Sequence, residues 1–123
     1  MRKPTTKKQF EYFRSCCEKA AKRYGLSNWV INYRHSNLKE EGYIADTEWN
    51  STSMEAYIRL NKGVDEEELV DNELLKEAAI HEVRHILLGQ INDLLENYYA
   101  DEFIDPIIHD LIQRLENANR YIK

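Results

Sequence analysis

The sequence predicts an α+β fold in which an N-terminal helix and a small sheet precede two further helices. Apolar residues recur at helical spacing near the start of the chain and again over its second half. Between these regions, segments 29–35, 42–49 and 54–60 alternate apolar and polar side chains, as half-buried strands do. Their short connections favour a three-stranded, mainly antiparallel sheet, with one face on the core.

Length and charge restrict the classes of protein that the chain can form. Its 123 residues suffice for one core and not two, so a single domain spanning residues 1–123 is expected. A net charge of −5 argues against nucleic acid as the main partner. No apolar run has the length of a membrane span, and the N-terminus lacks the apolar segment of a signal peptide. We therefore expect a cytoplasmic protein with no membrane partner.

Local signals place the ends of the helices. Thr5 or Thr6 is expected to cap a first helix that runs to about Tyr24. Asp65 is expected to cap the second helix, with three glutamates in its first turn, and that helix is expected to loosen near Gly89. The pair Asp105-Pro106 indicates the start of the last helix, with Asp as the cap and Pro at the first helical position. The adjacent cysteines at positions 16 and 17 are expected to stay free.

The second helix contains the pattern His-Glu-x-x-His. His81 and His85 are four residues apart, which puts both rings on one helix face at a distance where they can share one zinc ion. Glu82 follows the first histidine, where a carboxylate can take a proton from a metal-activated water. Arg84 is charged where zinc peptidases of this pattern usually have an uncharged residue, and a side chain directed away from the metal would accommodate it.

A catalytic zinc site needs a third protein ligand and an open position. The downstream candidates are Glu96, Asp101, Glu102, Asp105, His109 and Asp110. His109 lies in the first turns of the last helix, which must pack on the motif helix to bury its apolar face. Glu102 precedes the expected helix start and remains the alternative. His35, at a strand end among polar residues, is expected to be a plain surface residue and not a ligand.

With these motifs, the chain resembles the minigluzincin-like single-domain metallopeptidases, small zinc enzymes of the HExxH type that include phage-encoded ones. The resemblance rests on strand 56–60, on the His81–His85 motif with the Ile-Leu-Leu that follows it, and on a helix of the 111–115 type. It implies a zincin-like domain, a Zn2+ cofactor and hydrolysis of peptide bonds. In that family a glutamate on the following helix completes the site, and the matching position here is His109.

The interpretation is a zinc-dependent metallopeptidase acting on a peptide or protein substrate. His81, His85 and His109 hold the metal, Glu82 is the general base, and no cofactor besides zinc is expected. A tyrosine such as Tyr57 is a possible oxyanion stabiliser, although nothing in the sequence selects it. The alternative is a non-catalytic interaction module on a degenerate metallopeptidase scaffold, with structural zinc or none. Arg84 and the altered third-ligand position favour that alternative, and the intact Glu82 disfavours it.

Overall fold

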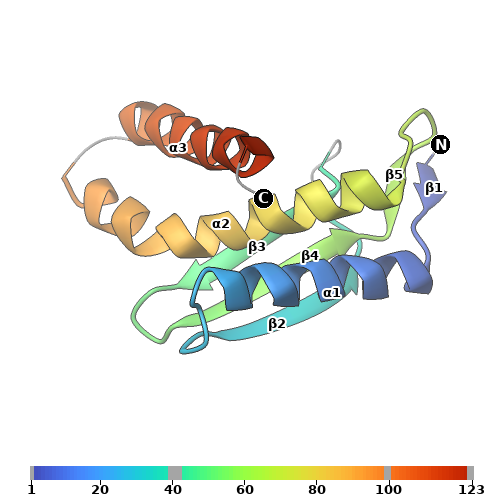
Figure 1. The fold of residues 1–123 in the computed structure, drawn as a ribbon, viewed down its shortest axis with the longest axis horizontal. Helices are drawn as coiled ribbons and strands as arrows, with labels where there is room; N and C mark the ends of the chain where they lie inside the picture. Colours follow the sequence, from blue (N-terminus) through green and yellow to red (C-terminus); the bar gives the residue numbers. More distant parts are fainter. Residues whose placement is uncertain (1, 39–42, 99–100, 122–123) are drawn as a thin grey trace.

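The computed structural model describes residues 2–38, 43–98 and 101–121, and it has the predicted α+β class. The elements follow in the order β1 (Arg2–Pro4), α1 (Lys7–Arg23), β2 (Val30–Ser36), β3 (Ala45–Asn50), β4 (Glu55–Asn61), β5 (Gly63–Asp65), α2 (Asn72–Glu96) and α3 (Asp101–Tyr121) (Figure 1). Among the described residues, no helix has both the length and the apolar character that crossing a membrane requires.

The first helix begins where its capping signal predicts. The Thr6 hydroxyl accepts a hydrogen bond from the Gln9 amide at 3.0 Å, and the Gln9 side chain accepts one from the Thr6 amide at 2.8 Å. This reciprocal capping box satisfies two donors that the helix itself leaves unpaired. Tyr24 is the C-cap, and Gly25 follows with a positive φ of 72°, which a glycine adopts without steric cost.

The sheet is mixed, and the prediction of an antiparallel meander is wrong for β2, which does not pair with the next strand along the chain. Its strand order is β2-β4-β3, with β3 antiparallel and β2 parallel to the central strand β4. Ala56, Ile58 and Leu60 of β4 are fully buried. The central position in the sheet buries more of the apolar side chains of this strand than an edge position would. A separate two-stranded ladder pairs β1 with β5 and holds the N-terminus against the segment that precedes α2.

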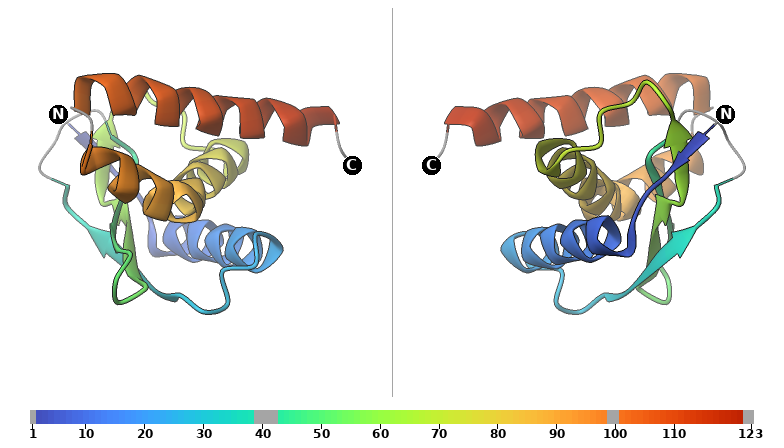
Figure 2. Two further views of the ribbon diagram at one scale, coloured as in Figure 1. Left: turned by 90° about the vertical axis from the view of Figure 1, so that its left-hand side faces the viewer. Right: turned by 90° about the vertical axis from the view of Figure 1, so that its right-hand side faces the viewer.

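Helices α1 and α2 cover one face of the sheet, and α2 lies between α1 and α3 (Figure 2). The main core is formed where these two helices meet the sheet, with Phe13, Cys17, Ala79 and Val83 fully buried. Helix α3 packs on α2 through a second, smaller cluster of Ile104, Ile108 and Ile112 against Leu88 and Leu95. The second helix therefore contacts every other layer of the molecule.

Three expected helix features are corrected by the structure. Helix α2 is capped by Asp71, whose carboxylate accepts from the Leu74 amide at 2.9 Å, because Asp65 is already paired with Arg2 in the β1–β5 ladder. It continues unbroken through Gly89 to Glu96. Helix α3 begins at Asp101, so that Pro106 lies inside it. This proline removes one backbone hydrogen bond near the helix start, where water can reach the freed carbonyl.

Candidate metal site

His81 and His85 face each other on α2. Their Nε2 atoms are 3.2 Å apart, and their ring centroids are 4.9 Å apart with the planes at 72°. Two ligands on a tetrahedral zinc with bonds of 2.0–2.1 Å are separated by about 3.3 Å. The two nitrogens therefore already have the spacing that one shared ion requires. Both side chains are half-buried, so the pair is open on one side.

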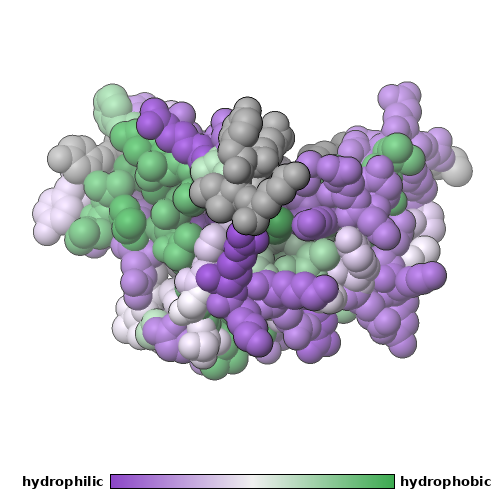
Figure 3. Space-filling view, viewed as in Figure 1, coloured by the Kyte–Doolittle hydropathy of each residue, from purple (hydrophilic) through white to green (hydrophobic). Residues whose placement is uncertain are grey.

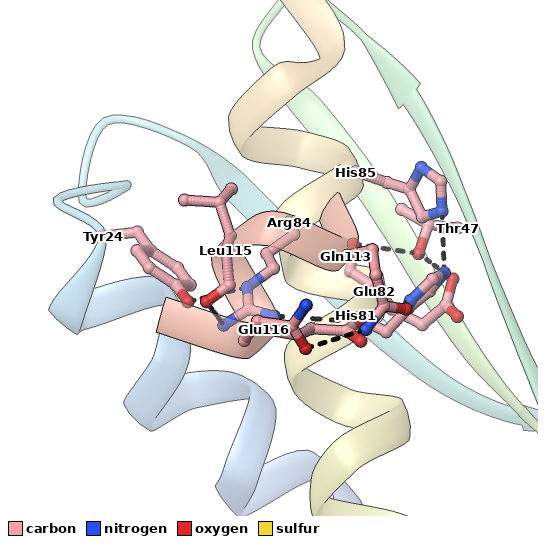
Figure 4. A network of polar contacts seen from close by, with 10 residues as sticks. Tyr24, Thr47, His81, Glu82, Arg84, His85, Gln113, Leu115 and Glu116 are labelled. Atoms are coloured by element: carbon pink, nitrogen blue, oxygen red, sulfur yellow. Dashed lines mark hydrogen bonds and ion pairs between the residues drawn. The ribbon is translucent and has the colours of Figure 1, made fainter. Parts of the chain in front are cut away.

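The other ring nitrogen of His81 is held by a carboxylate from α3. Nδ1 of His81 lies 3.0 Å from Oε1 of Glu116 (Figure 4). A carboxylate only accepts, so Nδ1 carries the proton and the lone pair of Nε2 is directed at His85. Carboxylates that orient a metal-binding histidine in this way are characteristic of zinc sites. The sequence reasoning missed Glu116, although it lies two helical turns after His109 and so on the same face of α3.

Arg84 is directed away from the two histidines and joins three helices (Figure 4). Its side chain is 1% exposed, Nε donates to the Tyr24 hydroxyl at 2.9 Å, and Nη2 donates to the Leu115 carbonyl at 3.2 Å. Nη1 lies 3.7 Å from Oε1 of Glu116. The arginine thus fixes the last turns of α3 against α2 and places a positive charge behind the carboxylate that holds His81. Its charge is used within the fold and does not conflict with a metal at the histidines.

Glu82 is buried beside the pair and anchored to the sheet. It is 8% exposed, and its Oε1 accepts a hydrogen bond from the Thr47 hydroxyl of β3 at 2.7 Å. Burial raises the pKa of this carboxyl, and the hydrogen bond from Thr47 and the nearby His81 oppose that rise. The result is a fixed carboxylate that is more basic than an exposed glutamate, as a general base for neutral pH requires. Nothing in the sequence distinguishes Thr47 from the other residues of its alternating strand segment.

Trp49 of β3 covers the other histidine. Its ring is stacked near that of His85, with centroids 6.2 Å apart and planes at 14°, and its Nε1 donates to Asp93 at 3.3 Å. A Cβ atom on Gly89 would come within 2.6 Å of Trp49 Nε1, so the glycine lets this ring approach α2. Burial, followed by the neighbouring His81 and His109, lowers the pKa of His85 to about 4. His85 is therefore neutral near pH 7, the form that binds metal.

The structure places His109 beside the histidine pair and Glu102 away from it. The His109 ring stands edge-on to that of His85, with centroids 5.9 Å apart and planes at 82°. Glu102 is exposed and has no hydrogen-bond or ion-pair partner within the described ranges. Glu96 accepts from Asn92, and Asp110 pairs with Arg114. The side chain of Asp101 lies outside the described ones, and among the side chains that the structure describes no group of three or more histidine, cysteine or acidic residues has a metal-binding arrangement.

Other candidates lie elsewhere in the fold. The His35 ring is half-buried, is stacked on Phe10 at 5.2 Å, and lies 2.7 Å from the Thr5 hydroxyl, so it is not the plain surface residue that was expected. Tyr57 pairs across the sheet with Glu48 and lies under the Arg34 guanidinium, on the face opposite Thr47 and Glu82. The geometry therefore does not place Tyr57 where an oxyanion would form.

Comparisons with known proteins give one structural similarity. The chain resembles the crystal structure of the metallopeptidase zymogen of Methanocaldococcus jannaschii jannalysin, with 25% identity over 84% of this chain and 89% of that chain, at a TM-score of 0.44. No protein-family model matches the chain, and no curated protein matches it. A TM-score below 0.5 does not assign the chain to a family, so the functional argument rests on the residues themselves.

Proposed function

We propose that the protein is a zinc-dependent metallopeptidase, with His81 and His85 as metal ligands and Glu82 as the general base. The observation that carries the proposal is the 3.2 Å separation of the two Nε2 atoms, with Glu116 holding the far nitrogen of His81. When bound, zinc would supply Lewis-acid chemistry, polarising the scissile carbonyl and lowering the pKa of water. Proton transfer and substrate binding would be carried out by residues of this chain.

Glu82 is the residue suited to move the proton. In peptide hydrolysis a base takes a proton from the attacking water and returns one to the leaving nitrogen. The Thr47 hydroxyl fixes one carboxylate oxygen of Glu82, and no described residue hydrogen-bonds the other. The second oxygen is therefore available to water, while burial makes the carboxylate a stronger base.

The sheet edge next to Glu82 is the proposed place for the substrate backbone. Strand β3 is the last strand of the β2-β4-β3 sheet and pairs on one side only among the described residues. An extended peptide can add to such an edge through main-chain hydrogen bonds. Thr47 of β3 contacts Glu82 and Trp49 of β3 packs on His85, so a peptide along this edge would pass the candidate metal site.

His109 is proposed as the third ligand, with Glu102 as the alternative. An imidazole beside His85 can complete the metal site by a local movement, whereas Glu102 lies two turns earlier on the same helix. Neutral histidine is as suitable a zinc ligand as a carboxylate.

A second function is favoured by one observation. The described residues do not assemble a three-ligand metal group, and His109 is exposed. A non-catalytic interaction module without zinc would have no need of one, whereas structural zinc would require a fourth protein ligand, a position that Glu102 could fill. The two functions differ in what they require of Glu82, because only hydrolysis uses its basicity.

The test is hydrolysis of a fluorescence-quenched peptide library by the purified protein with zinc, and again with a chelator. We expect cleavage that the chelator abolishes and that Glu82→Gln loses while keeping fold and zinc content, because an amide cannot accept the proton. Glu77→Gln, an exposed position on the same helix, is the matched control and should cleave like the parent. Equal cleavage by the parent and by Glu82→Gln would remove Glu82 from the mechanism.

A further inference from the structure

A cavity of about 290 Å³ opens between α1 and α2. Its apolar walls come from Ala20 and Ile80 and from the rings of Tyr12 and Tyr24. The described residues that line it include neither a proposed metal ligand nor the general base, so the cavity is separate from the candidate metal site. Cavities that bind small molecules have volumes of about 300–1,000 Å³, and this one lies at the lower end of that range. Its size therefore suits a small ligand.

Positive charge gathers around this cavity. Helix α1 has six basic and two acidic residues, although the whole chain has a net charge of −5. Figure 3 shows mainly hydrophilic residues over the region where Figure 1 places α1. Lys19, Arg23 and Lys76 line the cavity, and among the described residues no acidic side chain does. None of these three cations forms an ion pair or a hydrogen bond with a described side chain. The positive charge at the cavity is therefore not neutralised by an ion pair in the described part of the chain.

The positions of these cations are not explained by the stability of the helices. Lys19 and Arg23 are one turn apart on α1, a spacing at which two like charges destabilise a helix. The helix dipole favours Arg23, which is in the last turn of α1, but Lys19 lies one turn earlier. Lys76 is the fifth residue of α2, near the end of a helix that favours an anion. An anion bound between these side chains would relieve their repulsion.

We propose that this cavity binds a small phosphate monoester with an aromatic ring. Lys19 and Arg23 approach from α1 and Lys76 from α2, so an anion bound between the helices meets cations on both sides. A phosphate monoester has a charge of about −1.5 to −2 at pH 7, whereas a carboxylate has one negative charge and would neutralise less of this cluster. Arginine and lysine are the side chains that bind phosphate in proteins. The rings of Tyr12 and Tyr24 give the aromatic ring of the ligand walls to pack on.

Alkylation of Cys16 reports occupancy of the cavity, because Cys16 lines it while Cys17, the other cysteine of the chain, is fully buried. The rate of labelling by N-ethylmaleimide is followed by mass spectrometry at increasing concentrations of phenyl phosphate. At about ten times the Kd of this probe, labelling of Cys16 should slow about tenfold. Inorganic phosphate and phenol, each at the same concentration and ionic strength, should slow the labelling much less, because each has only half of the recognised chemistry.

Paired charge variants test where the anion binds. Lys19→Gln/Arg23→Gln should raise the Kd for phenyl phosphate about tenfold or more, because two charge-assisted contacts are lost. Lys8→Gln/Lys22→Gln is the matched control, since it removes the same charge from two exposed positions of α1 that do not line the cavity. This control should bind nearly like the parent. All four side chains are exposed, so both double variants keep the core intact.

Four results would overturn the proposal. Labelling of Cys16 that does not change at millimolar phenyl phosphate would mean that the cavity binds no such ligand. Equal protection by inorganic phosphate would show that the walls do not recognise the ring. Equal protection by benzoate would make the ligand a carboxylate. An equal loss of affinity in the two double variants would reduce the effect to the net charge of α1.

Discussion

Glu116 and His81 form the contact that gives the candidate metal site its direction. The carboxylate of α3 lies 3.0 Å from Nδ1 of the α2 histidine, and Nε2 of the same ring lies 3.2 Å from His85. The proton on Nδ1 leaves the Nε2 lone pair facing the second histidine. Arg84, buried behind Glu116, fixes the helix that carries the carboxylate. The same contacts therefore hold α3 on α2 and orient His81, the proposed metal ligand.

Glu116→Ala should weaken zinc binding by about 10–100-fold, because His81 would lose the group that sets its tautomer and ring orientation. Competition with a chelator of known zinc affinity measures the change. Gln113→Ala is the control, since Gln113 is on the same helix and, among the residues that the structure describes, bonds only Asn117. If both variants bind zinc equally well, Glu116 has no part in the site.

His109→Ala should lower zinc affinity far more than Glu102→Ala. The His109 ring already contacts that of His85, whereas Glu102 is exposed without a partner within the described ranges. Zinc titration of both variants against a competing chelator at neutral pH distinguishes them. Loss of zinc by Glu102→Ala alone would instead make that glutamate the third ligand.

Arg84→Ala should lower the free energy of unfolding by about 1.5–3 kcal/mol, because it removes charge-assisted hydrogen bonds to Tyr24 and to the Leu115 carbonyl from a buried position. Urea unfolding followed by circular dichroism measures this. The control is Arg114→Ala, whose side chain is 75% exposed, and it should change stability little. Equal effects of the two substitutions would mean that Arg84 does not hold α3.

His35 should make stability depend on pH. Burial, with a contribution from Lys62, lowers the pKa of His35 in the folded protein, so the unfolded chain binds the proton more readily. The contribution of His35 is therefore present above its ordinary pKa of about 6.5 and is lost as pH falls through and below that value. Urea unfolding of zinc-free protein between pH 7 and 5 should show a smaller loss for His35→Gln than for the parent, with Lys62→Gln in between. Identical pH slopes would contradict this.

The sequence predicted those features that depend on neighbouring residues. The cap at Thr6, one of the two threonines expected, the three strand segments and the meeting of His81 with His85 all follow from short spacings. The strand order does not follow from short spacings. The parallel pairing of β2 with β4 depends on which strand buries the most apolar surface at the centre of the sheet. The Asp105-Pro106 signal was overridden because α3 gains packing by starting earlier, at the cost of one hydrogen bond.

The supporting residues of the candidate site were missed because their roles depend on contacts between elements that are distant in the sequence. Thr47, Trp49 and Glu116 contact the motif from other elements, and their types and spacings are ordinary in a strand or a helix. Gly89 was interpreted as a weak point of the helix, whereas its missing side chain makes room for Trp49. Only the packing of β3 and α3 on α2 gives these residues a role.

The central claim is that His81 and His85 share one zinc ion, and calorimetric zinc titration tests it most directly. The parent, freed of metal with a chelator and then dialysed, should bind one zinc per chain. His81→Ala and His85→Ala should each lose that binding, while His35→Ala, which alters a histidine remote from the pair, should retain it. Binding of zinc by both single variants with the affinity of the parent would contradict the account.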